Sequence, residues 1–117
     1  MILVEEQENL TKKKAIQKIV SDIRSLGRGG TAGRNYFKYV VVSDDNKNVE
    51  IWTVDARYDP KEPIGRRVQT RFSVKDKNTR NKPVYYDWTF WGGRYGEDWF
   101  TDMKRFLERE IGKSFSF

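Results

Sequence analysis

The chain has 117 residues, the size of one ordinary domain, and its 23 Lys and Arg against 17 Asp and Glu give a net charge of +6 and a pI near 9.6. It contains no Cys and no His, which excludes disulfides, the usual zinc sites and catalysis by Ser-His or Cys-His pairs. A basic balance favours an anionic partner, nucleic acid first and an acidic membrane surface second, although many basic proteins bind neither.

No apolar run in the sequence approaches the roughly 20 residues of a membrane span, and the four apolar residues at the start are followed at once by acidic ones. We therefore expect a soluble, cytoplasmic protein with no membrane partner. We also expect residues 1–117 to form a single domain with flexible ends at 1–8 and 113–117.

A helix is predicted to begin at Asn9 or Thr11 and to end at Leu26. Apolar residues recur there at steps of three and four, the spacing of one helix face: Ile16, Ile19, Val20, Ile23 and Leu26. Thr11 can cap the first turn, and Gly27 stands where a glycine commonly ends a helix. We interpret the lysines early in this segment as a solvated face of the helix.

Residues 27–35, GRGGTAGRN, combine four glycines with Arg28 and Arg34. Glycine allows many backbone conformations, so we expect a mobile, basic loop. It is not a phosphate-binding P-loop, because the Gly-Lys-Ser/Thr ending is absent and a strand rather than a helix follows. Two interpretations stay open: a flap that wraps a phosphate backbone, or a linker between the helix and the sheet.

Four strands are predicted in the middle of the chain, at 36–43, 49–58, 66–75 and 84–91. The segments after the first and third strands are short enough for hairpins, which favours an antiparallel sheet. A second amphipathic helix is predicted from Glu97 or Asp98 to Ile111, with Gly112 at its end. The expected fold class is therefore α+β, a four-stranded antiparallel sheet in α-β-β-β-β-α order with the helices packed on one face. The other face stays open or serves a dimer.

The third predicted strand alternates strictly between apolar and polar residues, which is typical of a half-buried strand. Val68, Thr70, Phe72 and Val74 are expected to face the core. The cationic and polar side chains between them are expected to face outward.

The fourth predicted strand carries aromatic rings on both faces. Tyr86, Trp88 and Phe90 are expected to point into the core. Tyr85 and Trp91 are expected to point outward, beside the cations of the third strand. Bases stack on such rings while cations hold phosphates, so this hairpin favours the binding of a single nucleic-acid strand.

The predicted binding residues come from strands and loops. Trp52 is a third candidate ring, and Tyr39 and Tyr58 extend the platform unless a one-residue bulge reverses their facing. The cationic candidates near the strands are Arg57, Arg66, Arg67, Arg71 and Lys75. Three further arginines are expected to close around the nucleic-acid strand from loops: Arg28, Arg34 and Arg94.

Acidic residues offer an alternative chemistry. Asp59-Pro60-Lys61 has the Asp-x-Lys spacing of metal-dependent nucleases, in which a carboxylate binds Mg²⁺ and the lysine steadies the attacking water. The same three residues also fit an ordinary turn. Asp55 can instead pair with its neighbour Arg57. Asp87 can pair with Arg71 in the same way.

The segment VEIWTVDARYDPKEPIGRRV, residues 49–68, resembles the positive-cofactor-type ssDNA-binding domains. In that family a strand ending in Val-Asp-x-Arg-x-Tyr leads into a basic loop with Pro and Gly, and the residues in similar order here are Val54, Asp55, Arg57, Tyr58, Pro63, Gly65 and Arg66. The leading helix and the aromatic fourth strand depart from that family. The layout of four strands flanked by helices is also similar to the archaeal ThermoDBP-like ssDNA-binding proteins. Both resemblances imply ssDNA binding on a sheet.

The leading hypothesis is a non-enzymatic nucleic-acid-binding domain that prefers single strands, DNA rather than RNA, and needs no cofactor or metal. One alternative is a small metal-dependent nuclease that uses Asp55, Asp59 and Lys61. The other is a protein-interaction module whose open aromatic face forms a homodimer.

Overall fold

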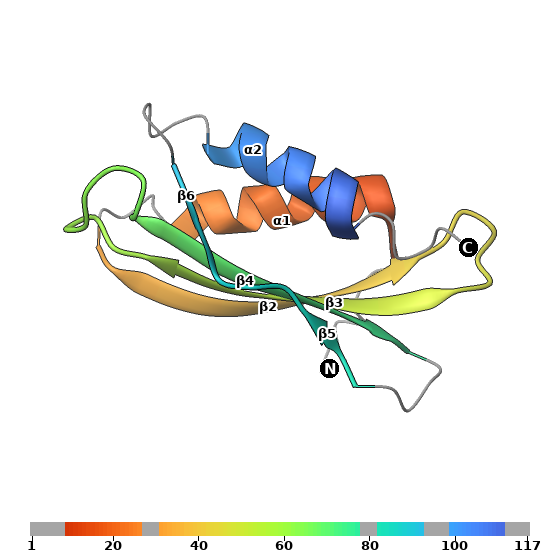
Figure 1. Cartoon of the computed structure of the whole chain (residues 1–117). Helices are drawn as coiled ribbons and strands as arrows, with labels where there is room; N and C mark the ends of the chain where they lie inside the picture. Colours follow the sequence, from red (N-terminus) through yellow and green to blue (C-terminus); the bar gives the residue numbers. More distant parts are fainter. Residues whose placement is uncertain (1–8, 27–30, 78–81, 93–98, 112–117) are drawn as a thin grey trace, which may run out of the picture.

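The computed structural model describes residues 9–26, 31–77, 82–92 and 99–111, which form a twisted sheet with helices on one of its faces (Figure 1). The strands are β1 (Asn9–Thr11), β2 (Gly33–Val42), β3 (Val49–Tyr58), β4 (Val68–Asp76), β5 (Val84–Tyr85) and β6 (Thr89–Trp91). The helical elements are α1 (Lys12–Leu26), α2 (Trp99–Phe106) and η1 (Leu107–Ile111), a π-helical turn that continues α2.

The sheet has the order β1-β2-β3-β4, and both β5 and β6 pair with the outer side of β4. β1 is parallel to β2, and the other neighbouring strands are antiparallel. The mixed content confirms the α+β class. The expected count of four strands is imprecise, because the sequence pattern does not predict β1 and the fourth predicted strand is divided into β5 and β6.

Strand β1 leads directly into α1 through Thr11. Its side-chain oxygen accepts a hydrogen bond from the backbone N–H of Lys14 (3.3 Å), which confirms the predicted cap. The side chains of α1 that are buried against the sheet follow the predicted stripe: Ala15, Ile16, Ile19 and Ile23. The predicted end residue Gly27 lies outside the described residues.

The unit formed by α2 and η1 packs against the sheet through an aromatic cluster. Its buried side chains are Met103, Leu107 and Ile111. The ring of Phe106 lies 5.6 to 5.9 Å, centre to centre, from the rings of Phe72, Tyr86 and Trp91. These contacts place the predicted apolar stripe of this helix over β4 and the edge beside it. The predicted end residues Asp98 and Gly112 fall outside the described ranges.

A one-residue bulge separates β5 from β6. Tyr85 pairs with Ser73 of β4, and Phe90 pairs with Gln69, so five steps on one strand oppose four on the other. Because side chains alternate between faces with a period of two, one extra residue reverses the facing of everything after it. Tyr85 and Phe90 therefore point to the same face, and Trp91 points to the opposite one.

The segment between β2 and β3 forms the turn that its Asp and Asn residues predict. Asn46 adopts a positive φ of 58°, a conformation that Asn tolerates. The Asp45 carboxylate accepts hydrogen bonds from the Ser43 hydroxyl (2.5 Å) and from the backbone N–H of Lys47 (3.0 Å). The hydroxyl bond is the main cause that holds the pKa of Asp45 below its ordinary value, and the amide bond adds to it.

Candidate functional site

The face of the sheet turned away from α1 and α2 is called here the open face (Figure 1). The strand register defines it, because paired residues share a face and successive residues alternate. Its polar and aromatic half consists of Arg34, Tyr36, Lys38, Thr53, Asp55, Arg57, Gln69, Arg71, Ser73, Tyr85 and Phe90. Its other half, toward the β2–β3 turn, consists of Val40, Val42, Val49, Ile51 and Lys75.

Three arginines lie over aromatic rings along the outer side of β4. The guanidinium carbon of Arg71 is 4.4 Å from the ring centre of Tyr85. The corresponding distance is 4.5 Å from Arg57 to Trp88 and 5.1 Å from Arg66 to Phe90. Such contacts hold a cation and a flat ring side by side.

The rings of this face are largely exposed. The exposed fraction is 60% for Tyr36, 54% for Tyr85 and 44% for Phe90. Folded proteins bury most large apolar side chains, so a group of exposed rings beside cations needs a reason other than core formation. The exposed ring faces are available to a flat ligand.

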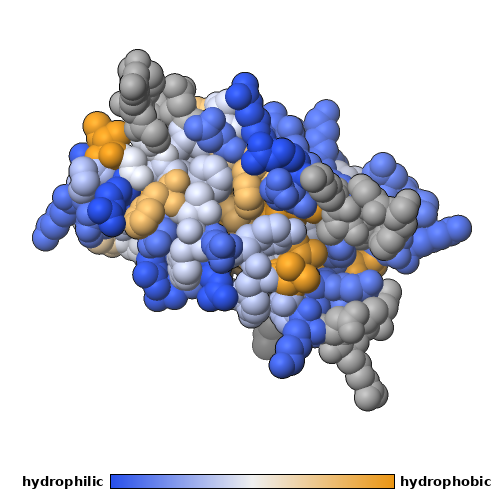
Figure 2. Space-filling view, in the orientation of Figure 1, coloured by the Kyte–Doolittle hydropathy of each residue, from blue (hydrophilic) through white to orange (hydrophobic). Residues whose placement is uncertain are grey.

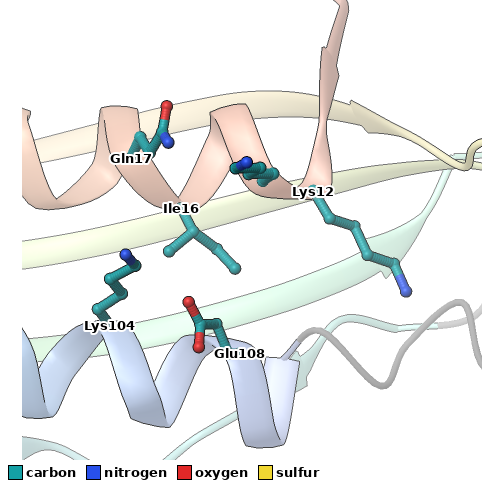
Figure 3. A pocket seen from close by; sticks show the side chains of 6 residues that line it. Lys12, Ile16, Gln17, Lys104 and Glu108 are labelled. Atoms are coloured by element: carbon teal, nitrogen blue, oxygen red, sulfur yellow. The ribbon is translucent and has the colours of Figure 1, made fainter.

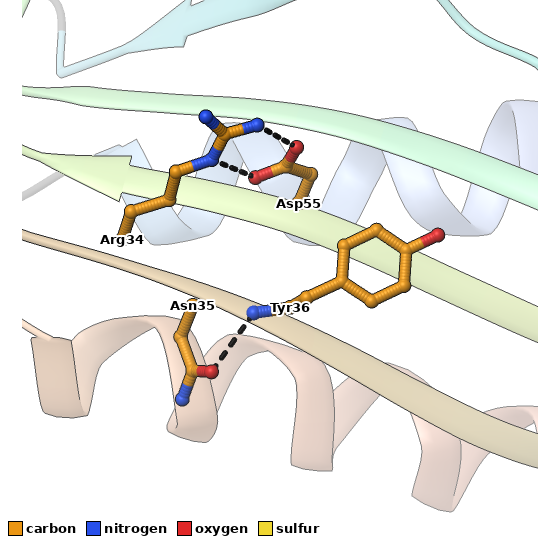
Figure 4. A network of polar contacts seen from close by, with 4 residues as sticks. All are labelled: Arg34, Asn35, Tyr36 and Asp55. Carbon is orange, nitrogen blue, oxygen red and sulfur yellow. Dashed lines mark hydrogen bonds and ion pairs between the residues drawn. The ribbon is translucent and has the colours of Figure 1, made fainter.

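Positive charge predominates on the strands of the open face. Among the strand residues described there, Asp55 is the one carboxylate, and it forms a two-point ion pair with Arg34 (Figure 4). Nε of Arg34 donates to Oδ1 at 2.9 Å and its terminal nitrogen to Oδ2 at 2.6 Å. This bond raises the pKa of Arg34 above its ordinary value. The remaining strand cations are Lys38, Arg57, Arg71 and Lys75.

The face of the molecule seen in Figure 2 is largely hydrophilic. Figure 2 shows hydrophilic residues over most of the visible surface, with hydrophobic ones in separate small areas among them. The core of an obligate protein interface is more apolar than such a surface. This composition suits a charged ligand better than a large apolar partner.

A cavity of about 240 Å³ lies at the end of the open face where the β3–β4 loop meets β6. Its lining comes from the loop and from both strands that flank it: Arg57, Asp59, Glu62, Arg66, Arg67, Gln69 and Phe90. The loop is held by backbone bonds, including Asp59 N–H to the carbonyl of Arg67 (2.9 Å). The Arg67 side chain donates from Nε to the carbonyl of Glu62 (2.8 Å). Hydrogen bonds within the β3–β4 loop therefore hold one side of the cavity in place.

Two of the rings predicted to bind bases lie in the core instead. Trp52 is 1% exposed, and its N–H donates to the carboxylate of Glu50 at 2.9 Å. Trp91 is 8% exposed, and its N–H donates to the hydroxyl of Thr70 at 2.7 Å. The expectation that these rings face outward is wrong, and neither is accessible for stacking on a base.

Tyr39 and Tyr58 also lie on the helix side of the sheet rather than on the open face. Tyr39 is 3% exposed and donates a hydrogen bond to the Asp22 carboxylate of α1 at 2.7 Å. Burial is the main cause that raises the pKa of this phenol, and the bond to Asp22 is the next. The predicted extension of the platform through these tyrosines is wrong.

The sequence pattern assigns Phe90 and Trp88 to the core, whereas Phe90 lies on the open face and Trp88 contacts Arg57 of that face. The bulge between β5 and β6 causes the error. A signal for Trp52 was present in β3, where it shares its alternation with Val54 and Ala56, both fully buried. The exposure of Tyr36 follows from the same rule, since it pairs with Asp55.

The cations predicted to bind phosphates lie in three different places. The register places Arg57, Arg71 and Lys75 on the open face, and Arg66 and Arg67 line the cavity at its end. Arg34 was expected in a loop but lies on β2. Arg28 and Arg94 fall outside the described residues.

The acidic residues considered for a nuclease have other partners. Asp55 is bound to Arg34, not to Arg57. The Asp59 carboxylate accepts a bond from the backbone N–H of Lys61 at 3.0 Å, which is the geometry of a turn. Within residues 9–26, 31–77, 82–92 and 99–111, no three acidic side chains come together as a group that could hold a metal ion.

A second cavity, of about 320 Å³, lies between α1 and the α2–η1 unit, on the far side of the molecule from the open face (Figure 3). Lysines dominate its lining, with Ile16 between them: Lys12, Lys13, Ile16, Gln17, Lys104 and Glu108. In Figure 3, Lys104 and Glu108 rise from one helix toward Ile16 of the other. Lys12 and Lys13 belong to the predicted solvated face of the first helix, whereas Lys104 lies on α2.

Comparison with known proteins finds no matching family model, no matching curated protein and no matching solved structure. The resemblances to ssDNA-binding proteins therefore stay predictions. In the described part of the chain, no helix combines the length and apolar character needed to cross a membrane.

Proposed function

We propose that this protein binds single-stranded nucleic acid, DNA in preference to RNA, on its open face and without catalysis. The observation that carries the proposal is the row of three arginine–ring contacts beside β4, Arg71 with Tyr85, Arg57 with Trp88 and Arg66 with Phe90. The preference for DNA rests on the resemblances noted in the sequence.

Each contact in the row supplies both interactions that a single strand needs. A guanidinium group binds a phosphate through paired N–H donors, and it can also stack on a base with its flat face. An aromatic ring offers a second flat surface to the next base. Cation and ring are already in contact, so little side-chain freedom is lost when the strand binds.

The proposal favours single strands over duplexes because only an unpaired strand exposes the faces of its bases. Duplex DNA would reach the cations through its phosphates alone. Stacking adds about 1–3 kcal/mol per base, so two or three rings suffice for a clear preference. Little dependence on base sequence is expected from stacking, since every base has a flat face.

The deciding experiment is a titration with labelled ssDNA, duplex DNA and RNA of equal length, followed by fluorescence anisotropy with and without Mg²⁺. We expect ssDNA to bind most tightly and the labelled strands to stay intact over a long incubation. Equal affinity for duplex and single strand would contradict the stacking mechanism. Metal-dependent cleavage that Asp55→Ala or Asp59→Ala abolishes would favour the nuclease.

A second copy of the chain is the alternative partner for the open face. Its half toward the β2–β3 turn carries four partly buried aliphatic side chains: Val40, Val42, Val49 and Ile51. Light scattering after size exclusion gives the mass in solution. A dimer that dissociates when Ile51→Lys is introduced would favour this alternative. If the open face binds ssDNA instead, the Ile51→Lys protein should stay folded and bind ssDNA normally.

A further inference from the structure

We propose that the cavity beneath the β3–β4 loop holds one guanine base of the bound strand. The inference rests on the proposed function and adds a base preference to it. The cavity, of about 240 Å³, is smaller than the roughly 300–1,000 Å³ of pockets for drug-sized ligands. Its size fits one base at the end of the open face better than a larger molecule.

The cavity offers hydrogen-bond donors that match one edge of guanine. Arg57 and Arg66 line it, and a guanidinium group donates two parallel bonds to the O6 and N7 acceptors of guanine. This pair is the commonest specific contact between proteins and bases. Arg67 is less available, because its Nε already donates to the carbonyl of Glu62.

The cavity also offers acceptors, which separates guanine from the other bases. Asp59 and Glu62 are among its lining residues, and one Asp59 oxygen already accepts the N–H of Lys61. Guanine presents two adjacent donors, N1–H and the 2-amino group, which the two oxygens of a carboxylate can accept together. Thymine has a single N–H donor, and it cannot satisfy a carboxylate and a guanidinium as completely.

A stacking surface completes the cavity. The ring of Phe90 forms one wall, and the guanidinium carbon of Arg66 lies 5.1 Å from its centre. A flat cationic group therefore already occupies the space next to this ring. A guanine base can stack on the ring or on the guanidinium plane, since bases stack on both.

The loop that carries the carboxylates is held in shape by its own bonds. The N–H of Asp59 donates to Arg67, and the N–H of Arg66 donates to the carbonyl of Pro63, both at 2.9 Å. Gly65, with φ of 93°, supplies a conformation that residues with a side chain rarely adopt. A bonded backbone leaves less of the loop to be ordered when the base arrives, which reduces the cost of binding.

The test compares two labelled oligonucleotides, one of roughly twelve thymidines and one in which a central thymidine is replaced by guanosine. We expect the guanosine strand to bind about tenfold more tightly, which is within the range for one well-placed contact pair. Inosine lacks the 2-amino group, so a strand with inosine at that position should lose most of the advantage.

Glu62→Gln tests the carboxylate directly. Only the backbone carbonyl of Glu62 bonds to Arg67, so the substitution leaves that bond in place. We expect it to reduce the preference for guanosine, because one charged acceptor becomes neutral, while the thymidine strand binds as before. Glu108→Gln makes the same change of charge on the far side of the molecule, and it should leave the preference intact.

The outcomes separate the two proposals. Equal affinity for the guanosine and thymidine strands would overturn the guanine site and leave the proposed function standing. A preference that Glu62→Gln leaves unchanged would equally overturn it. Failure to bind any oligonucleotide would overturn both.

Discussion

At the scale of single residues, exposure and hydrogen bonding divide the aromatic side chains into two groups. Trp52, Trp91 and Tyr39 are buried, and each donates a hydrogen bond to another side chain. Tyr85 and Phe90 are exposed and carry an arginine on one face. Removing a buried ring should lower the stability of the fold, whereas removing an exposed ring should weaken ligand binding. Substitutions can therefore assign each group to its role.

The contact between Arg71 and Tyr85 should matter for binding and not for folding. We expect Tyr85→Ala to weaken ssDNA binding by about 1–3 kcal/mol, or roughly 5- to 150-fold, because one stacking surface is lost. Arg71→Ala should weaken ssDNA binding more than Tyr85→Ala does at low salt, where the attraction between the arginine and a phosphate is least screened. Anisotropy titrations and thermal melting measure the two effects, and Tyr85→Phe is the control that keeps the ring. A large fall in melting temperature for Tyr85→Ala would place that ring in the core.

The neighbours Phe90 and Trp91 offer a matched pair on opposite faces. Trp91→Ala should destabilise the protein by about 3–5 kcal/mol, because it opens a cavity beside Phe106 and leaves the Thr70 hydroxyl without its donor. Phe90→Ala should cost less than about 1 kcal/mol. Urea unfolding monitored by circular dichroism gives both values. Equal losses for the two variants would contradict the bulge.

At the scale of elements, the sequence pattern predicts what regular alternation controls. The strict alternation of β4 predicts the burial of Val68, Thr70, Phe72 and Val74, and all four are buried. The apolar stripes predict both helices, and Asp and Asn predict the β2–β3 turn. Long elements repeat their signal several times, so a single unusual residue does not change the prediction.

Two features of the sheet could not be predicted from the sequence. Strand β1 has three residues, too few to show a period, and its parallel pairing with β2 is a long-range contact. The bulge between β5 and β6 leaves no mark in composition, since rings stand on both sides of it. The facing of Trp88, Phe90 and Trp91 depends on that one residue, and the candidate site was misassigned there for this reason.

The bond between Tyr39 and Asp22 joins β2 to α1, and it should make stability depend on alkaline pH. Burial and this bond raise the pKa of Tyr39 in the folded state above its unfolded value. The stabilisation is therefore fully present below about pH 10, the unfolded pKa, and is lost as the pH rises above it. Tyr39→Phe should cost about 1–3 kcal/mol at neutral pH and weaken the alkaline loss.

Urea unfolding at a series of pH values checks this prediction. Tyr36→Phe is the control, because Tyr36 is 60% exposed on the open face. Burial, with help from Glu110 and Glu50, also raises the pKa of Tyr86, so some alkaline loss should remain in the Tyr39 variant. An unchanged pH profile for Tyr39→Phe would contradict the assignment.

At the scale of the whole molecule, part of the net charge of +6 is concentrated on the open face. The strand cations of the open face stand against a single described carboxylate, and that carboxylate is bound to Arg34. A positive face attracts a polyanion over several ångströms before any contact forms, and dissolved salt weakens that attraction.

Affinity for an oligonucleotide should therefore fall steeply as salt rises. About four phosphate contacts with a single strand predict a slope of roughly −3 in a plot of log affinity against log salt concentration. Titrations at several salt concentrations measure it, and a double variant, Arg71→Ala with Lys75→Ala, should reduce the slope. An affinity independent of salt would exclude the electrostatic mechanism.

The bulge between β5 and β6 also makes this edge of the sheet a poor site for a second copy of the protein to add a strand. The outer side of β4 is paired by one segment of two residues and another of three, with the chain displaced between them. A long, straight outermost strand would present a continuous row of unpaired backbone groups, on which a second molecule could add its own strand. A strand broken into two short pieces cannot act as such a template. The bulge that turns Phe90 outward thus also makes strand addition at this edge of the sheet less favourable.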